Sequence, residues 1–141
     1  MITLMSIPEI GSVMDLWHKS MQEQFVSVKG EVLPKESEIK EIYETSNIYV
    51  VKDSANNIVG YASIVEGAYL ENIYIDKDFR RQSLGTQLIN LIKSKYDEIV
   101  TDVFEDNSEA IQFFNKMNFE NEGTSLNETL NKNEIAFYWS N

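Results

Sequence analysis

From residue 47 onward, β-rich segments and helical stripes follow one another in an order that constrains the fold more than any single residue does. Residues 47–53 and 58–66 are β-rich runs on either side of the polar turn SANN, which predicts an antiparallel hairpin. Four further elements then alternate: a strand over 69–75, a helix over 84–96, a strand over 98–104 and a helix within 105–119. This alternation predicts one layer of sheet with helices packed against it.

The two ends of the chain extend this pattern. After an apolar N-terminal strand segment, one face of a first helix is formed by Ile10, Val13, Met14, Trp17 and Met21. A second, shorter helix is expected over 35–44, and two strands are expected over 119–125 and 134–139. A chain of 141 residues has room for one hydrophobic core, so we expect a single α/β (α+β) domain over 1–141.

The composition excludes several kinds of chemistry. With no cysteine, the chain cannot use thiolate metal sites, disulfides or a cysteine nucleophile. Twelve Lys and Arg against 23 Asp and Glu give a net charge of -11, which disfavours nucleic acid and anionic lipid and favours a cationic partner such as an amine. Many soluble domains are equally acidic without such a role. The N-terminus lacks the basic segment of a signal peptide, and no run approaches the ~18 apolar residues of a membrane span. We therefore expect a cytoplasmic protein with no nucleic-acid or membrane partner.

The stretch FRRQSLGTQL, residues 79–88, lies between a predicted strand and a predicted helix. Such a junction can bind an anion, because the first amides of a helix lack partners and the helix dipole is positive there. The chain contains neither the Walker loop nor the dinucleotide-binding glycine pattern. A third phosphate loop, [QR]-x-x-G-x-[GA], is matched by Arg80 and Gly85, with Ser83 at its middle glycine. Taken alone, the stretch could equally be a solvated turn before a helix.

Three segments in a specific order decide between these alternatives. They are the strand LENIYID, the loop and helix FRRQSLGTQLINLI, and a final helix with the pattern N-x-x-A-x-x-F-F-x-K-x-x-F. The residues of that last pattern are Asn107, Ala110, Phe113, Phe114, Lys116 and Phe119. Over about residues 47–119 the chain resembles the GNAT superfamily of N-acetyltransferases.

The resemblance implies a fold and an activity. The fold would be GNAT-like, with a central mixed, mostly antiparallel sheet of about six or seven strands, about four flanking helices, and a splayed pair of strands around the CoA site. The activity would be transfer of an acetyl group from acetyl-CoA to a primary amine by direct attack, without a metal, in a monomer or homodimer. The amine could be a small molecule or a lysine of a peptide or protein.

The resemblance also implies which residues bind the donor. Loop amides would bind the pyrophosphate, and main-chain groups of the preceding strand would pair with the pantetheine arm. The residues implied are Ile73, Ile75, Arg80, Arg81, Gln82, Ser83, Leu84, Gly85, Thr86 and Asn107. Ser83 departs from the family glycine and gives up its conformational freedom. Asn107 could instead be only a helix cap.

The catalytic positions depart from the family pattern. Many members carry a catalytic Glu at the position of Tyr69, whereas here Glu71 lies two residues along, on the same face of the strand. Glu71 is therefore our candidate general base or water-orienting group, and the alternative is a solvated or salt-bridged carboxylate. The family's usual acid, a Tyr, is replaced by Phe114, which cannot donate a proton. A hydroxyl of Tyr69, Tyr74 or Tyr138, or a water, could substitute, and Phe114 could be simply part of the core.

In this family the acceptor lies between the first helices and the last hairpin, so segments 17–37 and 121–133 are expected to determine the choice of amine. His18, the only histidine, lies off the apolar stripe of the first helix and is expected at the surface. Because Phe114 and the displaced glutamate depart from the catalytic pattern, a catalytically silent acyl-CoA-binding regulatory module is the competing hypothesis.

Overall fold

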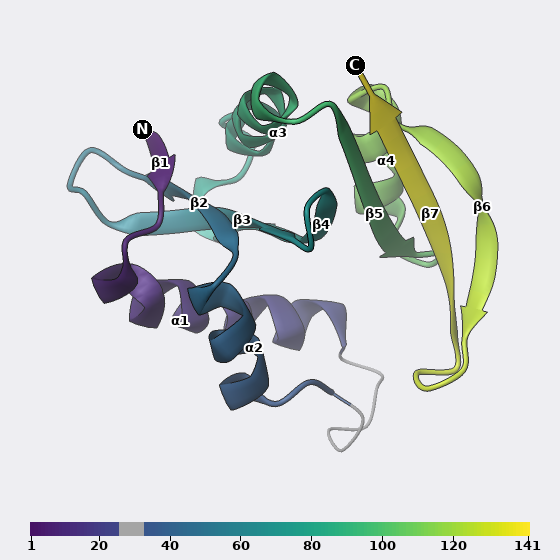
Figure 1. Cartoon of the computed structure of the whole chain (residues 1–141), viewed down its shortest axis with the longest axis horizontal. Coiled ribbons are helices and arrows are strands. Elements are labelled where there is room, and N and C mark those ends of the chain that lie inside the picture. The colour runs from purple at the N-terminus through teal and green to yellow at the C-terminus, as the bar shows by residue number, and fades with distance from the viewer. Residues whose placement is uncertain (26–32) are drawn as a thin grey trace.

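A seven-stranded mixed sheet, in the order β1-β2-β3-β4-β5-β7-β6, runs through the protein (Figure 1). The computed structural model describes residues 1–25 and 33–141. Within that part of the chain, the strands are β1 (Ile2–Leu4), β2 (Asn47–Lys52), β3 (Ile58–Val65), β4 (Tyr69–Ile75), β5 (Glu98–Phe104), β6 (Glu120–Asn127) and β7 (Lys132–Ser140). The α-helices are α1 (Ile10–Gln24), α2 (Glu36–Glu44), α3 (Leu84–Lys95) and α4 (Ser108–Lys116), and the short 3-10 helices are η1 (Ile7–Glu9) and η3 (Lys77–Phe79). Among the strand pairs of these described residues, β4–β5 is parallel and the others are antiparallel.

Helices α1 and α2 cover one face of the strands β1 to β4. Apolar side chains at helical spacing on α1, with Ile39 and Tyr43 of α2, pack on the strand residues that point to this face. The residues of this cluster are Val13, Met14, Leu16, Trp17, Ile39, Tyr43, Ile48, Val50, Tyr61 and Tyr74. The first helix therefore buries the face that its sequence spacing indicates.

The opposite face of the sheet packs against α3 and α4 in a larger cluster. Helix α3 contributes Leu88, Ile89 and Ile92, all fully buried, and α4 with the segment after it contributes Phe114, Met117 and Phe119. Asn118, with φ 65°, takes the left-handed conformation that ends α4 and turns the chain toward β6. This core extends across the β4–β5 junction and holds the two halves of the sheet together.

The two halves separate immediately after they meet. Strands β4 and β5 share a single register pair, Tyr69 with Val100, supported by hydrogen bonds from the Val100 amide to the Ala68 carbonyl (3.0 Å) and from Thr101 Oγ1 to the Leu70 carbonyl (2.8 Å). Figure 1 shows β5 diverging from the direction of β4. Within residues 1–25 and 33–141, the rest of the β4 edge has no neighbouring strand.

The predicted fold class is confirmed: a mixed, mostly antiparallel sheet flanked by helices, with a splayed pair at its centre. The hairpin expected over 47–66 forms β2 and β3. The last hairpin is longer than the sequence indicated, because β6 and β7 extend into the polar segment 126–133 from both ends and leave a turn over 128–131. Among the described helices, none combines the length and the hydropathy that a membrane crossing requires.

Candidate functional site

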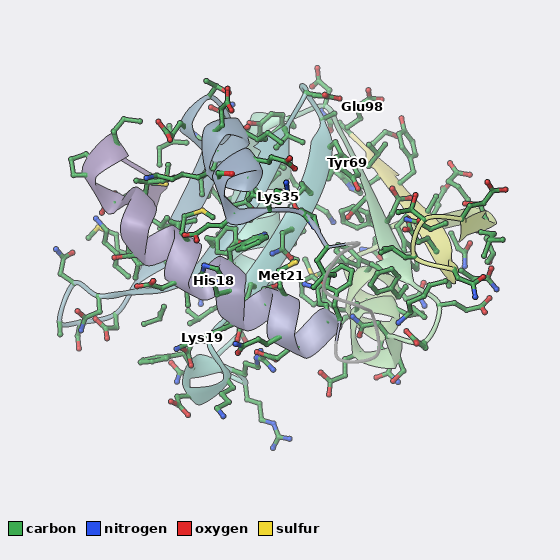
Figure 2. All side chains as sticks on the ribbon, turned by 90° about the horizontal axis from the view of Figure 1, so that it is seen from below. His18, Lys19, Met21, Lys35, Tyr69 and Glu98 are labelled. Carbon is green, nitrogen blue, oxygen red and sulfur yellow. The ribbon has the colours of Figure 1, made fainter. Side chains whose placement is uncertain are left out.

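A cleft of about 700 Å³ opens where β4 and β5 diverge. Its walls come from the C-terminal end of α1, the edge of β4, the outer half of β5, the start of α3 and one side of α4. Seen from the side of α1, Tyr69 lies between the half of the molecule that contains β1 to β4 and the half that contains β5 to β7 (Figure 2). The candidate residues that line the cleft are Tyr69, Glu71, Ile73, Ile75, Arg80, Gly85, Asn107 and Phe114.

A β-bulge at Glu71 changes which side chains of β4 face the cleft. In the pairing with β3, Asn72 lies opposite Ser63 and Leu70 opposite Ile64, so Glu71 is the extra residue. Glu71 and Asn72 consequently both point toward α1 and α2. Beyond the bulge, the Asp76 amide donates to the Val59 carbonyl, so the main-chain groups of Asp76 face β3. Because these groups alternate in direction along a strand, those of the residue next to Asp76 face the open edge. Ile75, one of the two residues predicted to pair with the pantetheine arm, is at such a position.

Glu71 is held inside the protein rather than in solvent. Its Oε1 accepts hydrogen bonds from the Tyr43 hydroxyl (2.5 Å) and the Ser63 hydroxyl (2.9 Å). Burial raises the pKa of the Glu71 carboxyl above its ordinary 4.5, and the two hydrogen bonds oppose that rise. Glu71 is therefore not a solvated carboxylate, and within residues 1–25 and 33–141 its hydrogen-bond partners are hydroxyls rather than a cation. A carboxylate with a raised pKa that lines a cleft is typical of functional sites.

The raised pKa predicts how the protein's stability depends on pH. Because folding makes Glu71 harder to ionise, its contribution is most favourable below pH 4.5 and is lost as pH rises through the folded-state pKa. Glu71→Gln keeps an oxygen for the Tyr43 and Ser63 hydroxyls and removes the charge. We expect its free energy of unfolding to exceed that of the wild type at pH 7 to 8, with the difference shrinking toward pH 4. Urea denaturation of both proteins across that range measures the effect, and a constant difference would contradict it.

The loop over residues 80–86, which we call the phosphate loop, contains two non-glycine residues with positive φ. Arg81 (φ 65°) and Ser83 (φ 61°, ψ 22°) both take the left-handed conformation. Ser83 thus adopts the conformation that glycine takes without strain. It precedes α3 without a side-chain capping bond, and the first helical hydrogen bond runs from the Gln87 amide to the Ser83 carbonyl. The amide groups of the first turn therefore have no hydrogen-bond partner within the helix, as an anion site requires.

Arg80 points along the cleft wall and is held there by three groups. Its Nε donates to the Ile75 carbonyl (2.8 Å), its Nη2 forms an ion pair with Glu23 Oε1 of α1 (2.7 Å), and its guanidinium lies over the Tyr74 ring. The Tyr74 hydroxyl donates to the other carboxylate oxygen of Glu23. Arg80 therefore connects α1, β4 and the phosphate loop. Because it already occupies the Ile75 carbonyl, pairing of the pantetheine arm at Ile75 stays a prediction.

Helix α4 forms the opposite wall of the cleft. The Asn107 side chain accepts a hydrogen bond from the Ala110 amide (3.1 Å), so Asn107 caps this helix as well as lining the cleft. A Cβ placed on Gly85 would lie 3.4 Å from the Phe113 ring, so the start of α3 fits closely against α4. The contact of Asn107 with the pantetheine arm stays a prediction.

Phe114 lines the cleft but belongs mainly to the core. Its side chain is 2% exposed, and its ring packs against those of Phe113, Phe119 and Phe137. Of the three tyrosines considered as substitute acids, Tyr69 and Tyr74 line the cleft, and burial raises the pKa of both. Tyr138 lies outside it and donates to Glu98 (3.1 Å).

A second hollow, of about 470 Å³, continues from the cleft over β5 and β7. The two hollows share Tyr69, Thr101 and Asp102. The Tyr69 hydroxyl donates to Asp102 Oδ2 (3.3 Å). Carboxylates predominate along both hollows: Glu23, Glu71, Asp102, Asp106, Glu109, Glu122 and Glu134, against the cations Arg80 and Lys132. This region can therefore receive a positively charged molecule.

Several residues of the site were not identified from the sequence. Tyr43 lies on the apolar face of α2 beside Ile39, a spacing that indicates core and nothing more. Ser63 is a small polar residue inside an otherwise apolar strand, and this contrast was the feature of the sequence that could have indicated its role. The segments expected to determine the acceptor are partly described. Residues 17–25 form the second half of α1 and its end, 33–37 lead into α2, and 121–133 belong to the β6–β7 hairpin, whereas 26–32 lie outside the described residues.

His18 lies at the surface, as its position off the apolar stripe predicts. It projects from α1 and pairs with Glu36 of α2 at 3.3 Å, away from the cleft (Figure 2). Within residues 1–25 and 33–141, no three His, Asp or Glu side chains come close enough together to hold a metal ion.

Comparison with known protein sequences gives a family match. A family model described as an acetyltransferase (GNAT) domain matches residues 18–137. The peptidyl-lysine N-acetyltransferase YjaB of Salmonella typhimurium is 28% identical over 85 residues, a match that covers 60% of this chain and 58% of that protein. The chain thus matches less than two thirds of the length of this relative.

Two solved structures illustrate proteins with the same fold. The protein smu.2055 of Streptococcus mutans superposes with a TM-score of 0.76 at 21% identity, covering 99% of this chain and 98% of that one. The spermidine N-acetyltransferase of Vibrio cholerae, solved in complex with CoA and spermine, superposes with a TM-score of 0.76 at 16% identity, covering 99% and 94%. At these identities the likeness concerns the fold alone.

Proposed function

Because the chain belongs to the GNAT acetyltransferase family, we propose that it is an N-acetyltransferase that moves an acetyl group from acetyl-CoA to a primary amine by direct attack. The observation that carries this proposal is the position of Glu71, a carboxylate with a raised pKa lining the cleft between the splayed strands. One end of that cleft reaches the phosphate loop and the other reaches the second hollow, over β5 and β7.

The residues present fit the donor. The first-turn amides of α3, at Leu84, Gly85 and Thr86, would hold the pyrophosphate, aided by the helix dipole. The free edge of β4 beyond Tyr69 would pair with the pantetheine arm as an added strand does. Acetyl-CoA would supply the thioester carbonyl that the amine nitrogen attacks, with the CoA thiolate as the leaving group.

The protein's own contribution is proton transfer and orientation. A lysine-like amine with a pKa of ~10.4 is mostly protonated at pH 7, and neutralising it costs about 4 to 5 kcal/mol. Glu71 would accept that proton, directly or through one water. Tyr69 and Asp102 would line the space in which the amine lies. The departing thiolate, with a pKa near the ~8.5 of cysteine, can leave without an acid at the position of Phe114.

The acceptor that we propose is a cationic amine, either a polyamine or the lysine side chain of a peptide. The carboxylates that line the cleft and the second hollow together favour a positive charge. YjaB is named a peptidyl-lysine N-acetyltransferase and the Vibrio cholerae structural neighbour a spermidine N-acetyltransferase, so each name corresponds to one of these two classes. A panel of polyamines, lysine peptides, amino acids and aminoglycosides, with CoA thiol release as the readout, tests the proposal. Absence of thermal stabilisation by acetyl-CoA far above any plausible Kd would refute it.

The competing function, a silent acyl-CoA-binding module, is favoured by one observation: the side chain at the position of the usual acid is part of the core. It predicts thermal stabilisation by acetyl-CoA without thiol release from any amine in the panel. Turnover of one amine excludes it.

Phe114→Tyr tests the role of that position. With the ring 2% exposed among three other phenylalanines, we expect the added hydroxyl to be buried without a partner and to lower the free energy of unfolding by about 1–3 kcal/mol, with no gain in thiol release. Urea denaturation and the thiol assay measure the two effects. A faster release with an altered pH profile would instead mean that the hydroxyl reaches the leaving thiolate.

A further inference from the structure

The buried polar groups behind Glu71 form a chain of hydrogen bonds with one direction. The Asn72 side-chain amide donates to the Tyr61 hydroxyl (2.8 Å), so the Tyr61 proton is free for the Tyr43 hydroxyl, which lies 3.0 Å away. The Tyr43 hydroxyl in turn donates to Glu71 Oε1 (2.5 Å). Every donor in this chain therefore points toward the carboxylate.

The chain is anchored on α1. The Asn72 side-chain amide also donates to Ser20 Oγ (3.1 Å), and its side-chain oxygen Oδ1 accepts a hydrogen bond from Gln24 Nε2 (3.2 Å). Gln24 Nε2 donates to Ser20 Oγ as well (2.6 Å). Ser20 and Asn72 are buried, as are Tyr43 and Tyr61. The β-bulge makes this possible, because it turns Glu71 and Asn72 to the same side of β4. Consecutive hydrogen bonds in one direction polarise one another and strengthen the last bond, the one to the carboxylate.

We propose that Tyr43 is a positioning residue that, together with Ser63, fixes Oε1 of Glu71 and leaves Oε2 as the oxygen that receives the proton of the amine. Both hydroxyls donate to the same oxygen, and within the described part of the chain Oε2 receives no hydrogen bond. Glu71 itself lines the cleft. This inference rests on the proposed function, in which Glu71 accepts that proton.

Among the described residues, the titratable groups that face the Glu71 carboxyl include three tyrosine hydroxyls. The hydroxyls of Tyr43 on α2, Tyr61 on β3 and Tyr69 on β4 face it, and burial raises the pKa of all three, so they stay neutral over the working pH range. Glu23 on α1 and Asp102 on β5 also line this cleft, and they accept hydrogen bonds from Tyr74 and Tyr69 instead of contacting Glu71 through one. A change in the titration of Glu71 on altering Tyr43 would therefore report their hydrogen bond.

Tyr43→Phe removes the donor and keeps the ring in place. We expect the Glu71 carboxyl, followed by carbon NMR of glutamate-labelled protein and assigned with Glu71→Gln, to titrate about 1 to 2 pH units higher than in the wild type. The acidic limb of the kcat/KM profile should move by the same amount. Ser63→Ala should shift both midpoints in the same direction, and it provides an independent test if Tyr43→Phe folds poorly.

Tyr49→Phe is the matched control, because Tyr49 is a buried tyrosine of the same sheet whose hydroxyl faces Tyr96 in the other core. It should leave both midpoints unchanged. An unshifted Glu71 midpoint in Tyr43→Phe, or the same shift in Tyr49→Phe, would overturn the proposal. A shift by NMR without a shift of the acidic limb would overturn its catalytic part. The NMR measurement needs no acceptor, so a wild type that acetylates no amine would refute the proposed function and leave the hydrogen-bond test intact.

Discussion

Glu71→Gln is expected to lower kcat/KM for a cationic amine by about 10²- to 10⁴-fold at pH 7, the usual worth of a general base. Glutamine keeps the shape of the side chain and an oxygen for the Tyr43 and Ser63 hydroxyls, so the fold and the cleft should persist. What is lost is the ability to accept a proton in the cleft. The loss should be smaller at high pH, where more of the amine is already neutral and needs no base.

The measurement is thiol release with a single amine from pH 6 to pH 10, compared with Glu120→Gln. Glu120 is an exposed carboxylate at the start of β6, outside both hollows, so it controls for the loss of one negative charge. Acetyl-CoA should raise the melting temperature of all three proteins equally, because the donor site is untouched. A Glu71→Gln protein that keeps most of its activity at pH 7 would exclude Glu71 as the base.

The phosphate loop illustrates what could be predicted from the sequence. Its position between a strand and a helix depends on local patterns of apolar and turn-forming residues, and these indicated β4, α3, β5 and α4 in the right order. The sequence placed Ser83 at the position of the family glycine, and the structure shows that Ser83 adopts a left-handed conformation. Local patterns thus indicated the order of the elements and the place of the loop, whereas the left-handed backbone at Arg81 and Ser83 was found only in the structure.

The surroundings of Glu71 illustrate what could not be predicted. Tyr43 and Glu71 are 28 residues apart in the sequence, and their hydrogen bond depends on how α2 lies across the sheet. The bulge at Glu71 has no glycine or proline to mark it, and it appears only through the pairing of β4 with β3. Long-range packing and strand register, which no local pattern encodes, therefore determine the environment of the proposed base.

Gly85→Glu is expected to abolish donor binding while keeping the fold, with a rise in Kd for acetyl-CoA of about 100-fold or more, corresponding to roughly 2.8 kcal/mol. Gly85 is in the first turn of α3 and lines the cleft, so the new carboxylate would lie where the pyrophosphate binds and would repel it. An acidic residue in the first turn of a helix is favourable for the helix itself. Loss of binding would therefore not arise from loss of structure.

Gly85→Ala separates the charge from the added bulk. Its Cβ would lie 3.4 Å from the Phe113 ring, a contact that small movements of the ring can accommodate, so we expect a change of only a few-fold in Kd. The increase in melting temperature produced by acetyl-CoA, measured for both variants and the wild type, reports donor binding without any acceptor. If Gly85→Glu kept the full increase, the pyrophosphate would not lie on the first turn of α3. The cleft would then have to bind the donor through other residues, and the assignment of the phosphate loop would be wrong.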